Sequence, residues 1–327
     1  MMLSPTAPSL PLPRLTQARA PLTCEIETIN EYGEQQTVSI PAERALTVYV
    51  DKRELVTLMT LGAHPELLVL GYLRNQRLVT HASDIESITV DWDVGAAAVK
   101  TRHGIKDIEE KTAKRVVTTG CGQGSVFGGL MDEVDQIVLP ADAHITQGQL
   151  YALVNTIRLK ETTYKSAGSV HACALFDMGG GEPEMLLFVE DVGRHNAIDT
   201  IAGWMSINRA PTLPTACGSL PPEGALRLRP GKAGSAAPAG TESAGLMFYT
   251  TGRLTSEMVI KSAQMGVPIV VSRSGITQMG HQVAQAVGLC AIGRATNKRF
   301  VCYASPQRLH LQPELAGPRP RTAGAER

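Results

Sequence analysis

One cysteine lies within a run of glycines and is the residue best placed to do chemistry. Residues 116–129 read VVTTGCGQGSVFGG, with Cys121 between Gly120 and Gly122. The β-branched residues before it favour a short strand, and the glycines favour a turn just past the strand end. Because neither glycine has a side chain, a partner could reach the sulfur of a reactive Cys121 thiol. The alternative is a small buried residue in a tight turn, since free cysteine is among the most buried residue types.

Four further loops follow predicted strands, and each carries both glycine and arginine: residues 191–196, 250–253, 272–275 and 293–299. If their strands run parallel, these loops and the Cys121 loop meet at one edge of a sheet, where open α/β folds bind ligands. Glycine lets a backbone approach a ligand closely, and arginine binds phosphate through two parallel hydrogen bonds. The pattern predicts a site for a nucleotide or a pyrophosphate-bearing cofactor. The alternative for each loop alone is a solvated turn with a surface arginine. The sequence holds no P-loop or Rossmann fingerprint.

Three polar residues near these loops leave their roles open. His195 could be a general base, could lower the pKa of Cys121 if the two lie close, or could be a structural hydrogen-bonding group. Asp191 could hold Arg194 or cap the helix that follows. Glu257 fits the first turn of a helix better than a ligand contact.

The elements that position these loops divide the chain into two parts. Residues 25–110 predict a small α+β domain, with a hairpin over 45–59, a helix from Pro65, and strands over 85–90 and 96–101. Residues 111–310 predict a larger α/β domain in which strands alternate with helices, which implies parallel strands. Its predicted helices span 147–162, 196–207, 255–265 and 277–287, and its predicted strands span 169–176, 185–190, 246–249, 269–271, 289–292 and 300–303. Disordered tails are expected at 1–24 and 311–327, and a disordered insertion rich in proline and glycine at 209–243.

Composition narrows the class of protein. The chain has 327 residues, formal net charge zero, 43% hydrophobic and 19% charged residues, as expected for a protein with a packed core. Zero net charge argues against nucleic acid as the main partner. No run reaches the ~18 apolar residues of a membrane span. A secretory signal is not recognisable either, so we expect a cytoplasmic protein without a membrane partner.

The cysteines do not form a recognisable framework. They are scattered, and none belongs to a C-x-x-C pair, which argues against a zinc ribbon or a thioredoxin-type motif. Cys173 and His171 share one face of a predicted strand, where packing is the favoured role. We expect a reducing compartment for the six cysteines, at positions 24, 121, 173, 217, 290 and 302.

Several long motifs resemble the FdhD family of formate dehydrogenase accessory proteins. They are DVGRHNAID at 191–199, TGRLTSEMV at 251–259, PIVVSRSG at 268–275 and TTGCG at 118–122, and residues 161–176 also fit. The resemblance covers roughly residues 40–208 and 245–310. It implies a larger three-layer domain similar to cytidine deaminase, and a homodimer. The deaminase zinc signature is absent, because His171 is not followed by glutamate two residues on, so no metal site is expected.

The resemblance also implies a function. Family members are sulfur carriers (sulfurtransferases) that take sulfur from a cysteine desulfurase as a persulfide. They pass it to the molybdenum or tungsten bis-molybdopterin guanine dinucleotide cofactor of formate dehydrogenase. By this resemblance Cys121 forms the persulfide, and the cofactor-binding segment corresponds to Ile292, Gly293, Arg294, Ala295, Thr296 and Asn297.

One departure from the family pattern concerns the cysteine loop. Many members have C-x-x-C, whereas Gly124 occupies the second position here. A single thiolate can still accept sulfane sulfur, because only one nucleophile is needed. The rival interpretation is a chaperone that binds the cofactor without transferring sulfur, with Cys121 only a turn residue.

Overall fold

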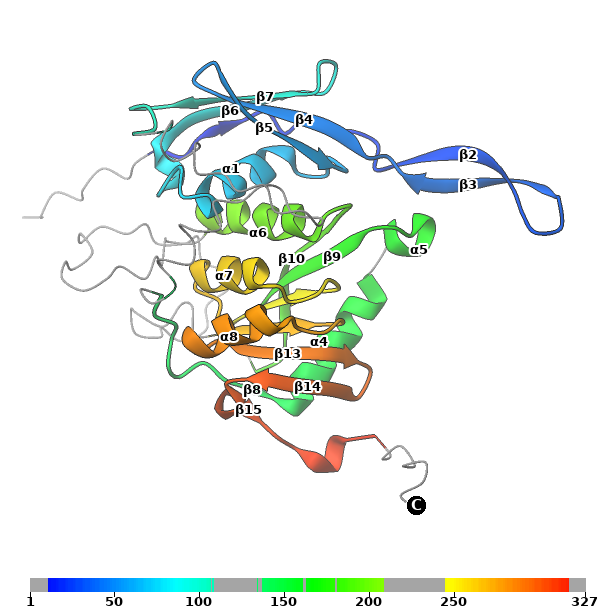
Figure 1. Cartoon of the computed structure of the whole chain (residues 1–327), viewed down its shortest axis with the longest axis vertical. Coiled ribbons are helices and arrows are strands. Elements are labelled where there is room, and N and C mark those ends of the chain that lie inside the picture. Colours follow the sequence, from blue (N-terminus) through cyan, green and yellow to red (C-terminus); the bar gives the residue numbers. More distant parts are fainter. Residues whose placement is uncertain are drawn as a thin grey trace, which may run out of the picture.

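The structure, a computed structural model, describes residues 11–106, 108, 134, 137–160, 163–179, 181–208 and 245–317. It shows a smaller sheet domain stacked on a larger one, with helices between and around the two sheets (Figure 1). Residues 107, 109–133 and 135–136, which include Cys121 and its predicted strand, lie outside the described part, and so do the predicted insertion at 209–243 and residues 318–327.

The small domain is a five-stranded sheet with one helix on its inner face. Alternate residues of the predicted hairpin, such as Leu46, Val48 and Leu58, are fully buried against α1 (Pro65–Asn75). Pro65 occupies the first turn of that helix, as the sequence predicts. The strands, in the spatial order β1-β6-β7-β4-β5, are β1 (Arg14–Leu15), β6 (Ile85–Asp91), β7 (Ala96–Thr101), β4 (Arg44–Val50) and β5 (Arg53–Thr60).

The expectation of a disordered tail over residues 1–24 is wrong for its described part. Strand β1 pairs in parallel with β6, and Leu15 and Ala18 pack against the small core. The buried carboxylate of Glu66 accepts hydrogen bonds from the Thr16 hydroxyl at 2.8 Å and the Ala18 amide at 2.7 Å. The composition of this segment did not predict its order, because it is held by the Glu66 carboxylate and by only two apolar side chains, without a periodic hydrophobic pattern.

A two-stranded hairpin, formed by β2 (Thr23–Ile29) and β3 (Gln35–Pro41), projects from the small domain (Figure 1). We call it the arm. The strands pair antiparallel over their whole length, and β3 contacts the short helix α5 (Thr163–Ala167) of the larger domain. The sequence analysis did not predict the arm as an element.

The large domain is built on a six-stranded mixed sheet. Strands β11, β12 and β13 run parallel and are joined by helices, as the strand–helix alternation predicts. Strand β9 is antiparallel to both of its neighbours, β10 and β11, and β14 is antiparallel to β13. In spatial order the strands are β10 (Glu184–Asp191), β9 (His171–Asp177), β11 (Leu246–Thr250), β12 (Ile269–Ser272), β13 (Cys290–Thr296) and β14 (Arg299–Ala304).

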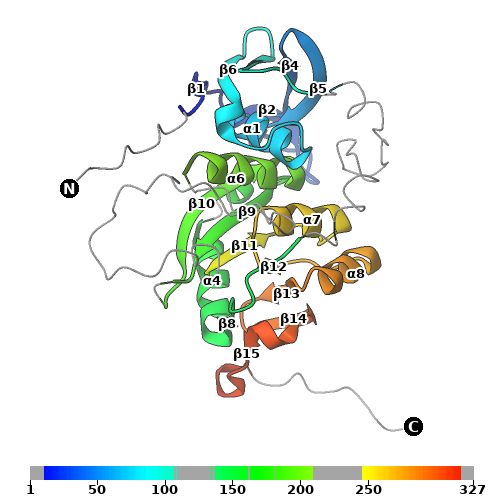
Figure 2. The same ribbon diagram turned by 90° about the vertical axis from the view of Figure 1, so that its left-hand side faces the viewer.

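Helices cover both faces of this sheet, so the domain has three layers. Figure 2 shows α6 (Arg194–Asn208), α7 (Ser256–Gln264) and α8 (Gln278–Ala286) on one side and α4 (Gln147–Lys160) on the other. Each side has its own hydrophobic cluster. The α4 side also holds the short parallel pair β8 (Ile145–Thr146) and β15 (Leu309–His310). The mixed α/β class is as expected, whereas the likeness to cytidine deaminase stays a prediction.

The two domains meet where α1 crosses α6, and glycine permits the close contact. A side-chain Cβ on Gly71 would overlap the backbone carbonyl of Asp199, and one on Gly203 would overlap that of Leu67. Only residues without side chains let two helix backbones approach this closely. Helix α6 is therefore enclosed by the sheet below and α1 above (Figure 1). In the described part of the chain, no helix has both the length and the hydropathy needed to cross a membrane.

Candidate functional site

The loops singled out from the sequence meet at one edge of the large sheet. Because β9 is antiparallel to both β10 and β11, β10 runs in the same direction as β11, β12 and β13. The segments that follow these four strands therefore leave the sheet at the same side, and β9 begins there with His171. This confirms the predicted convergence for the loops 191–196, 250–253 and 272–275, whereas the segment 293–299 begins inside β13. The fifth, which carries Cys121, lies outside the described residues.

Three exposed arginines stand along this side, which we call the arginine edge: Arg253, Arg273 and Arg294. Backbone hydrogen bonds hold their segments together. The amide of Arg273 donates to the carbonyl of Thr250 at 3.0 Å, and the amide of Arg294 donates to that of Ser274 at 2.7 Å. The three arginines thus lie on adjacent, hydrogen-bonded segments, and arginine can bind phosphate through two parallel hydrogen bonds.

The fourth predicted arginine, Arg194, is buried rather than exposed. It begins α6, and its side chain passes beneath Gly252, where an added Cβ would lie 2.6 Å from the Arg194 Cδ. Gly252 therefore has no room for a side chain. The hydroxyl of Ser272 donates to the Gly252 carbonyl at 2.7 Å, which fixes this loop to its neighbour. Arg194 supports the edge from below instead of offering its guanidinium to solvent.

Arg294 occupies a distorted position in the sheet. Its φ of 52° lies in the left-handed region, which side chains other than glycine seldom adopt. The pairing of β13 with β14 shifts register between Gly293 and Thr296, so a β-bulge falls at this residue. Bulges redirect side chains and are frequent beside binding sites. A residue in such a sparsely populated conformation persists only where the surrounding structure holds it there.

The segment carried over from the family resemblance is not a loop beyond a strand end, and that expectation is wrong. It forms the second half of β13 and the turn into β14, because the strand continues to Thr296. Side chains alternate along it, with Ile292 and Ala295 buried and Arg294, Thr296 and Asn297 exposed. Gly293 is confined between Tyr303 and the carbonyl of Ser274. The β-branched and apolar residues before Gly293 suggested the strand, but glycine suggested its end too early.

His171, at the start of β9, lies within the field of these arginines. Its pKa is lowered first by burial and then by the positive charges of Arg194 and Arg253, so its ring is neutral at pH 7. The ring nitrogen Nδ1 lies 3.5 Å from the Thr251 hydroxyl. Tyr164 on α5 reaches the same edge, with its ring 5.9 Å from the Arg273 guanidinium. The sequence analysis did not place either residue at the site, because their positions depend on strand order and on a short helix.

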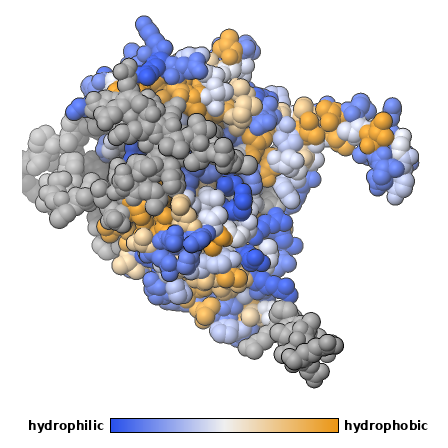
Figure 3. All heavy atoms as spheres, viewed as in Figure 1, coloured by the Kyte–Doolittle hydropathy of each residue, from blue (hydrophilic) through white to orange (hydrophobic). Residues whose placement is uncertain are grey.

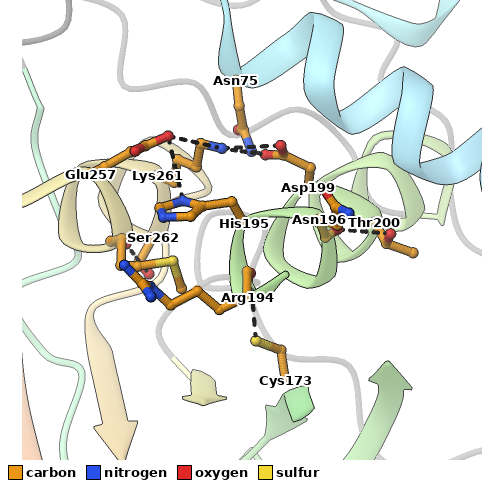
Figure 4. A network of polar contacts seen from close by, with 11 residues as sticks. Asn75, Cys173, Arg194, His195, Asn196, Asp199, Thr200, Glu257, Lys261 and Ser262 are labelled. Carbon is orange, nitrogen blue, oxygen red and sulfur yellow. Dashed lines mark hydrogen bonds and ion pairs between the residues drawn. The ribbon is translucent and has the colours of Figure 1, made fainter. Parts of the chain in front are cut away.

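His195 belongs to a buried network instead of the edge. Figure 4 shows His195, Asp199, Glu257 and Lys261 pointing toward one another from α6 and α7, with Asn75 reaching in from α1. The His195 Nδ1 lies 3.4 Å from the Glu257 carboxylate, and burial, with Lys261 and Arg194, lowers the pKa of His195 to about 2. A neutral, enclosed imidazole fits the structural alternative. Its distance to Cys121 stays untested.

The centre of this network is an ion pair. Lys261 lies 2.9 Å from Asp199, and the amide of Asn75 donates to the same carboxylate at 2.6 Å. Burial acts to lower the pKa of Lys261, but the carboxylates of Asp199 and Glu257 outweigh it and raise that pKa. The lysine is therefore charged, and Glu257 is both a first-turn residue of α7 and its partner at 3.4 Å.

Asp191 organises the start of α6. Its carboxylate accepts hydrogen bonds from the Asn196 amide at 2.9 Å, from the Thr60 hydroxyl at 2.5 Å and from the Gly193 amide at 3.3 Å. These bonds fix the turn before α6, and the bond to Thr60 joins this turn to the small domain. The choice between capping α6 and holding Arg194 stays untested. Burial raises the pKa of Asp191 despite these bonds.

The described cysteines near the edge include no activated thiol. Cys173 is fully buried and its thiol lies 3.3 Å from the Thr250 hydroxyl. Burial raises the pKa of Cys173 to about 12, so it stays protonated and inert, in agreement with the packing role. In the described part of the chain, no three His, Cys, Asp or Glu side chains gather as metal ligands would.

Taken together, these features define a two-domain α/β protein with three exposed arginines along one edge of its larger sheet. The chain belongs to the FdhD/NarQ family, whose model matches residues 41–216 and 232–310. Among curated relatives, the sulfur carrier protein FdhD of Bacillus subtilis strain 168 is 27% identical over 281 residues, which cover 85% of this chain and 94% of that protein. The sulfur carrier protein FdhD of Bacillus pumilus is 26% identical over 291 residues, or 86% and 95% of the two chains.

A solved structure supports the fold. A protein from Desulfotalea psychrophila, to which a role as a formate dehydrogenase accessory protein has been ascribed, superposes with a TM-score of 0.63. The match covers 88% of this chain and all of the other at 21% sequence identity. At that level of identity it supports the shared fold alone.

Proposed function

We propose that this protein is a sulfur carrier that supports a formate dehydrogenase. In this proposal Cys121 accepts sulfur from a cysteine desulfurase as a persulfide and transfers it to the bis-molybdopterin guanine dinucleotide cofactor, which is bound as cargo. The transfer takes place in the cytoplasm. Membership of the FdhD/NarQ family and the curated relatives named as sulfur carriers support this function. The TTGCG motif at 118–122 supports Cys121 as the acceptor.

The arginine edge is the observation that carries the proposal. The cargo has pyrophosphate groups, and Arg253, Arg273 and Arg294 present three exposed guanidinium groups from adjacent segments. The bulge at Arg294 and the exposure of Arg294, Thr296 and Asn297 suit the segment 292–297 to bind one guanine dinucleotide arm. Because His171 is neutral, the charge of the edge comes from its arginines and does not change near pH 7.

The uptake of sulfur needs one nucleophile and no oxidant. The Cys121 thiolate attacks the outer sulfur of the desulfurase persulfide, the S–S bond breaks, and the desulfurase cysteine leaves as a thiolate. Gly124 in place of a second cysteine does not prevent this step. The same glycine does favour the rival function, a chaperone that binds the cofactor without carrying sulfur.

Intact-mass spectrometry separates the two functions. After incubation with a cysteine desulfurase and cysteine, the wild type should gain ~32 Da, the mass of one sulfur. Digestion with trypsin, which cleaves after Arg115 and Arg158, should place this mass on the peptide of residues 116–158. The Cys121→Ala variant should gain no sulfur on that peptide and should still bind guanosine diphosphate. A wild type that gains no mass while its binding of guanosine diphosphate is intact would sink sulfur transfer and leave the chaperone.

A homodimer is part of the proposal, and the arm supports it. One face of the arm is apolar, with Cys24 and Ile26 opposite Ile40 and Val38, while the other carries Glu25 and Glu27. Figure 3 shows hydrophobic residues along the arm, and Ile26 is 39% exposed. A two-stranded hairpin is marginal in water unless something covers it.

A second copy of the chain matches the charge of the arm. Residues 23–41 hold four glutamates and neither lysine nor arginine, so the rest of a neutral chain has the balancing positive excess. Light scattering should show a dimer for the wild type and for the control Glu27→Gln. It should show a monomer for Ile26→Glu, which places a charge on the apolar face. A wild-type monomer would contradict this part of the proposal.

A further inference from the structure

Two cysteines that do not belong to the arginine edge lie in β13 and β14, the last two strands of the large sheet. Cys290 begins β13 and Cys302 lies in β14, directly opposite Ile292. Residues two apart in a strand share a face, so Cys290 and Cys302 are diagonal neighbours on the same face of the sheet. Both contribute to the hydrophobic cluster beneath α4. Both cysteines are free.

The two thiols differ in access and in chemistry. Cys290 is fully buried, whereas Cys302 is half-buried at the margin of the cluster, 3.5 Å from the carbonyl of Ala304. The neighbouring Cys290 thiol lowers the pKa of Cys302, and the Cys302 thiol, together with burial, raises the pKa of Cys290. A more accessible thiol with greater thiolate character beside a protected one is the arrangement of redox-sensing pairs.

We propose that Cys290 and Cys302 form a reversible dithiol–disulfide site that responds to hydroperoxides. The Cys302 thiolate attacks the O–O bond of the peroxide, becomes a sulfenic acid and releases hydroxide or alkoxide. The Cys290 thiol then attacks the Cys302 sulfur, which forms the disulfide and expels the sulfenic oxygen as water. The two sulfurs together lose two electrons, and the peroxide gains them.

The site is independent of the sulfur-carrier proposal, because it involves neither Cys121 nor any ligand. Formation of the disulfide would affect the structure close to the arginine edge. A cross-link between β13 and β14 beside Ile292 would fix the strand pair that continues into the bulge at Arg294. The oxidised protein should therefore unfold at a higher temperature than the reduced one, since the bond constrains the unfolded chain.

Peptide mapping tests the site directly, because trypsin separates the two cysteines. Cleavage after Arg273, Arg294, Arg299 and Arg308 places Cys290 in residues 274–294 and Cys302 in residues 300–308. After treatment with hydrogen peroxide and alkylation of the remaining thiols, the two peptides should appear as one cross-linked species. Its mass should be about 2 Da, or two hydrogens, below their sum, and dithiothreitol should release both.

Two variants and one internal comparison sharpen the test. In Cys290→Ser, Cys302 should stop at a sulfenic acid that dimedone traps, and in Cys302→Ser, Cys290 should stay a thiol. The fully buried Cys173 in the same wild-type sample reports non-specific oxidation. Recovery of both wild-type peptides as alkylated thiols, at a peroxide dose that oxidises glutathione added to the sample, would overturn the proposal. A Cys302 linked to any cysteine other than Cys290 would also overturn it.

Discussion

The buried Arg194 supports the arginine edge, and the buried network begins at the next residue, His195, yet the two regions hold charge in opposite ways. Among the described residues, Arg253 and Arg294 are exposed and form no ion pair. In the network, Lys261 is 1% exposed and bonded to Asp199, which is 0% exposed. A buried charge must be compensated inside the fold, whereas an exposed cluster of one sign is compensated from outside. The network therefore balances its charges within the fold, whereas the counter-charge for the edge must come from outside it.

The largest effect should follow from breaking the buried pair. In Lys261→Met the carboxylate of Asp199 stays buried without its counter-charge, which typically costs about 3–5 kcal/mol of unfolding free energy. Urea denaturation of the full chain measures it. Lys165→Met, at an exposed lysine of α5, is the matched control and should change stability by less than about 0.5 kcal/mol. A Lys261→Met variant as stable as its control would contradict the structural role of the network.

A second test uses the pH dependence of His195. Its folded pKa of about 2 lies below the ordinary value of 6.5, so below pH 6.5 the unfolded state binds a proton that the folded state does not. Stability is therefore lost as pH falls, by about 2 kcal/mol between pH 6.5 and about 4.5 from this group alone. His195→Gln should lose that much less over the same range, since every other titrating group is retained. Equal slopes for the two proteins would show that His195 is not held neutral.

A smaller loss of stability should follow from a substitution at Gly252, where the arginine edge packs on the buried Arg194. In Gly252→Ala the new methyl group would lie 2.6 Å from the Arg194 Cδ, and overpacking of this kind costs about 1–3 kcal/mol. Gly193→Ala is the control at the same edge, because its methyl group would meet Asn196 at an ordinary 3.6 Å. Thermal unfolding of both variants gives the comparison. If Gly252→Ala is no less stable than Gly193→Ala, Arg194 is not confined there.

The sequence predicts the edge better than the network, for physical reasons. Loops after strands are marked by local signals, so glycine and arginine at 250–253 and 272–275 could be placed once the strand–helix alternation was recognised. Strand ends are less certain, and β13 runs four residues beyond its predicted end because the bulge at Arg294 accommodates a glycine within the strand.

The buried network has no such local signal. Asp199 and Lys261 read as surface residues of two helices, and their burial arises only because α6 is enclosed between the sheet and α1. The glycines that allow this packing, Gly71 and Gly203, lie in helices where glycine is unfavourable. An unexplained glycine at such a position is the clue that could have revealed the helix crossing.

The central claim is that the arginine edge binds a guanine dinucleotide through its phosphates, and calorimetry with guanosine diphosphate tests it most directly. The wild type and the control Arg158→Ala, at an exposed arginine of α4, should bind, with an affinity that falls as salt rises. Arg294→Ala should bind roughly 10-fold or more weakly at unchanged stability, because a hydrogen bond to a charged group contributes about 1.5–3 kcal/mol. Binding of Arg294→Ala at the strength of the wild type would contradict the account.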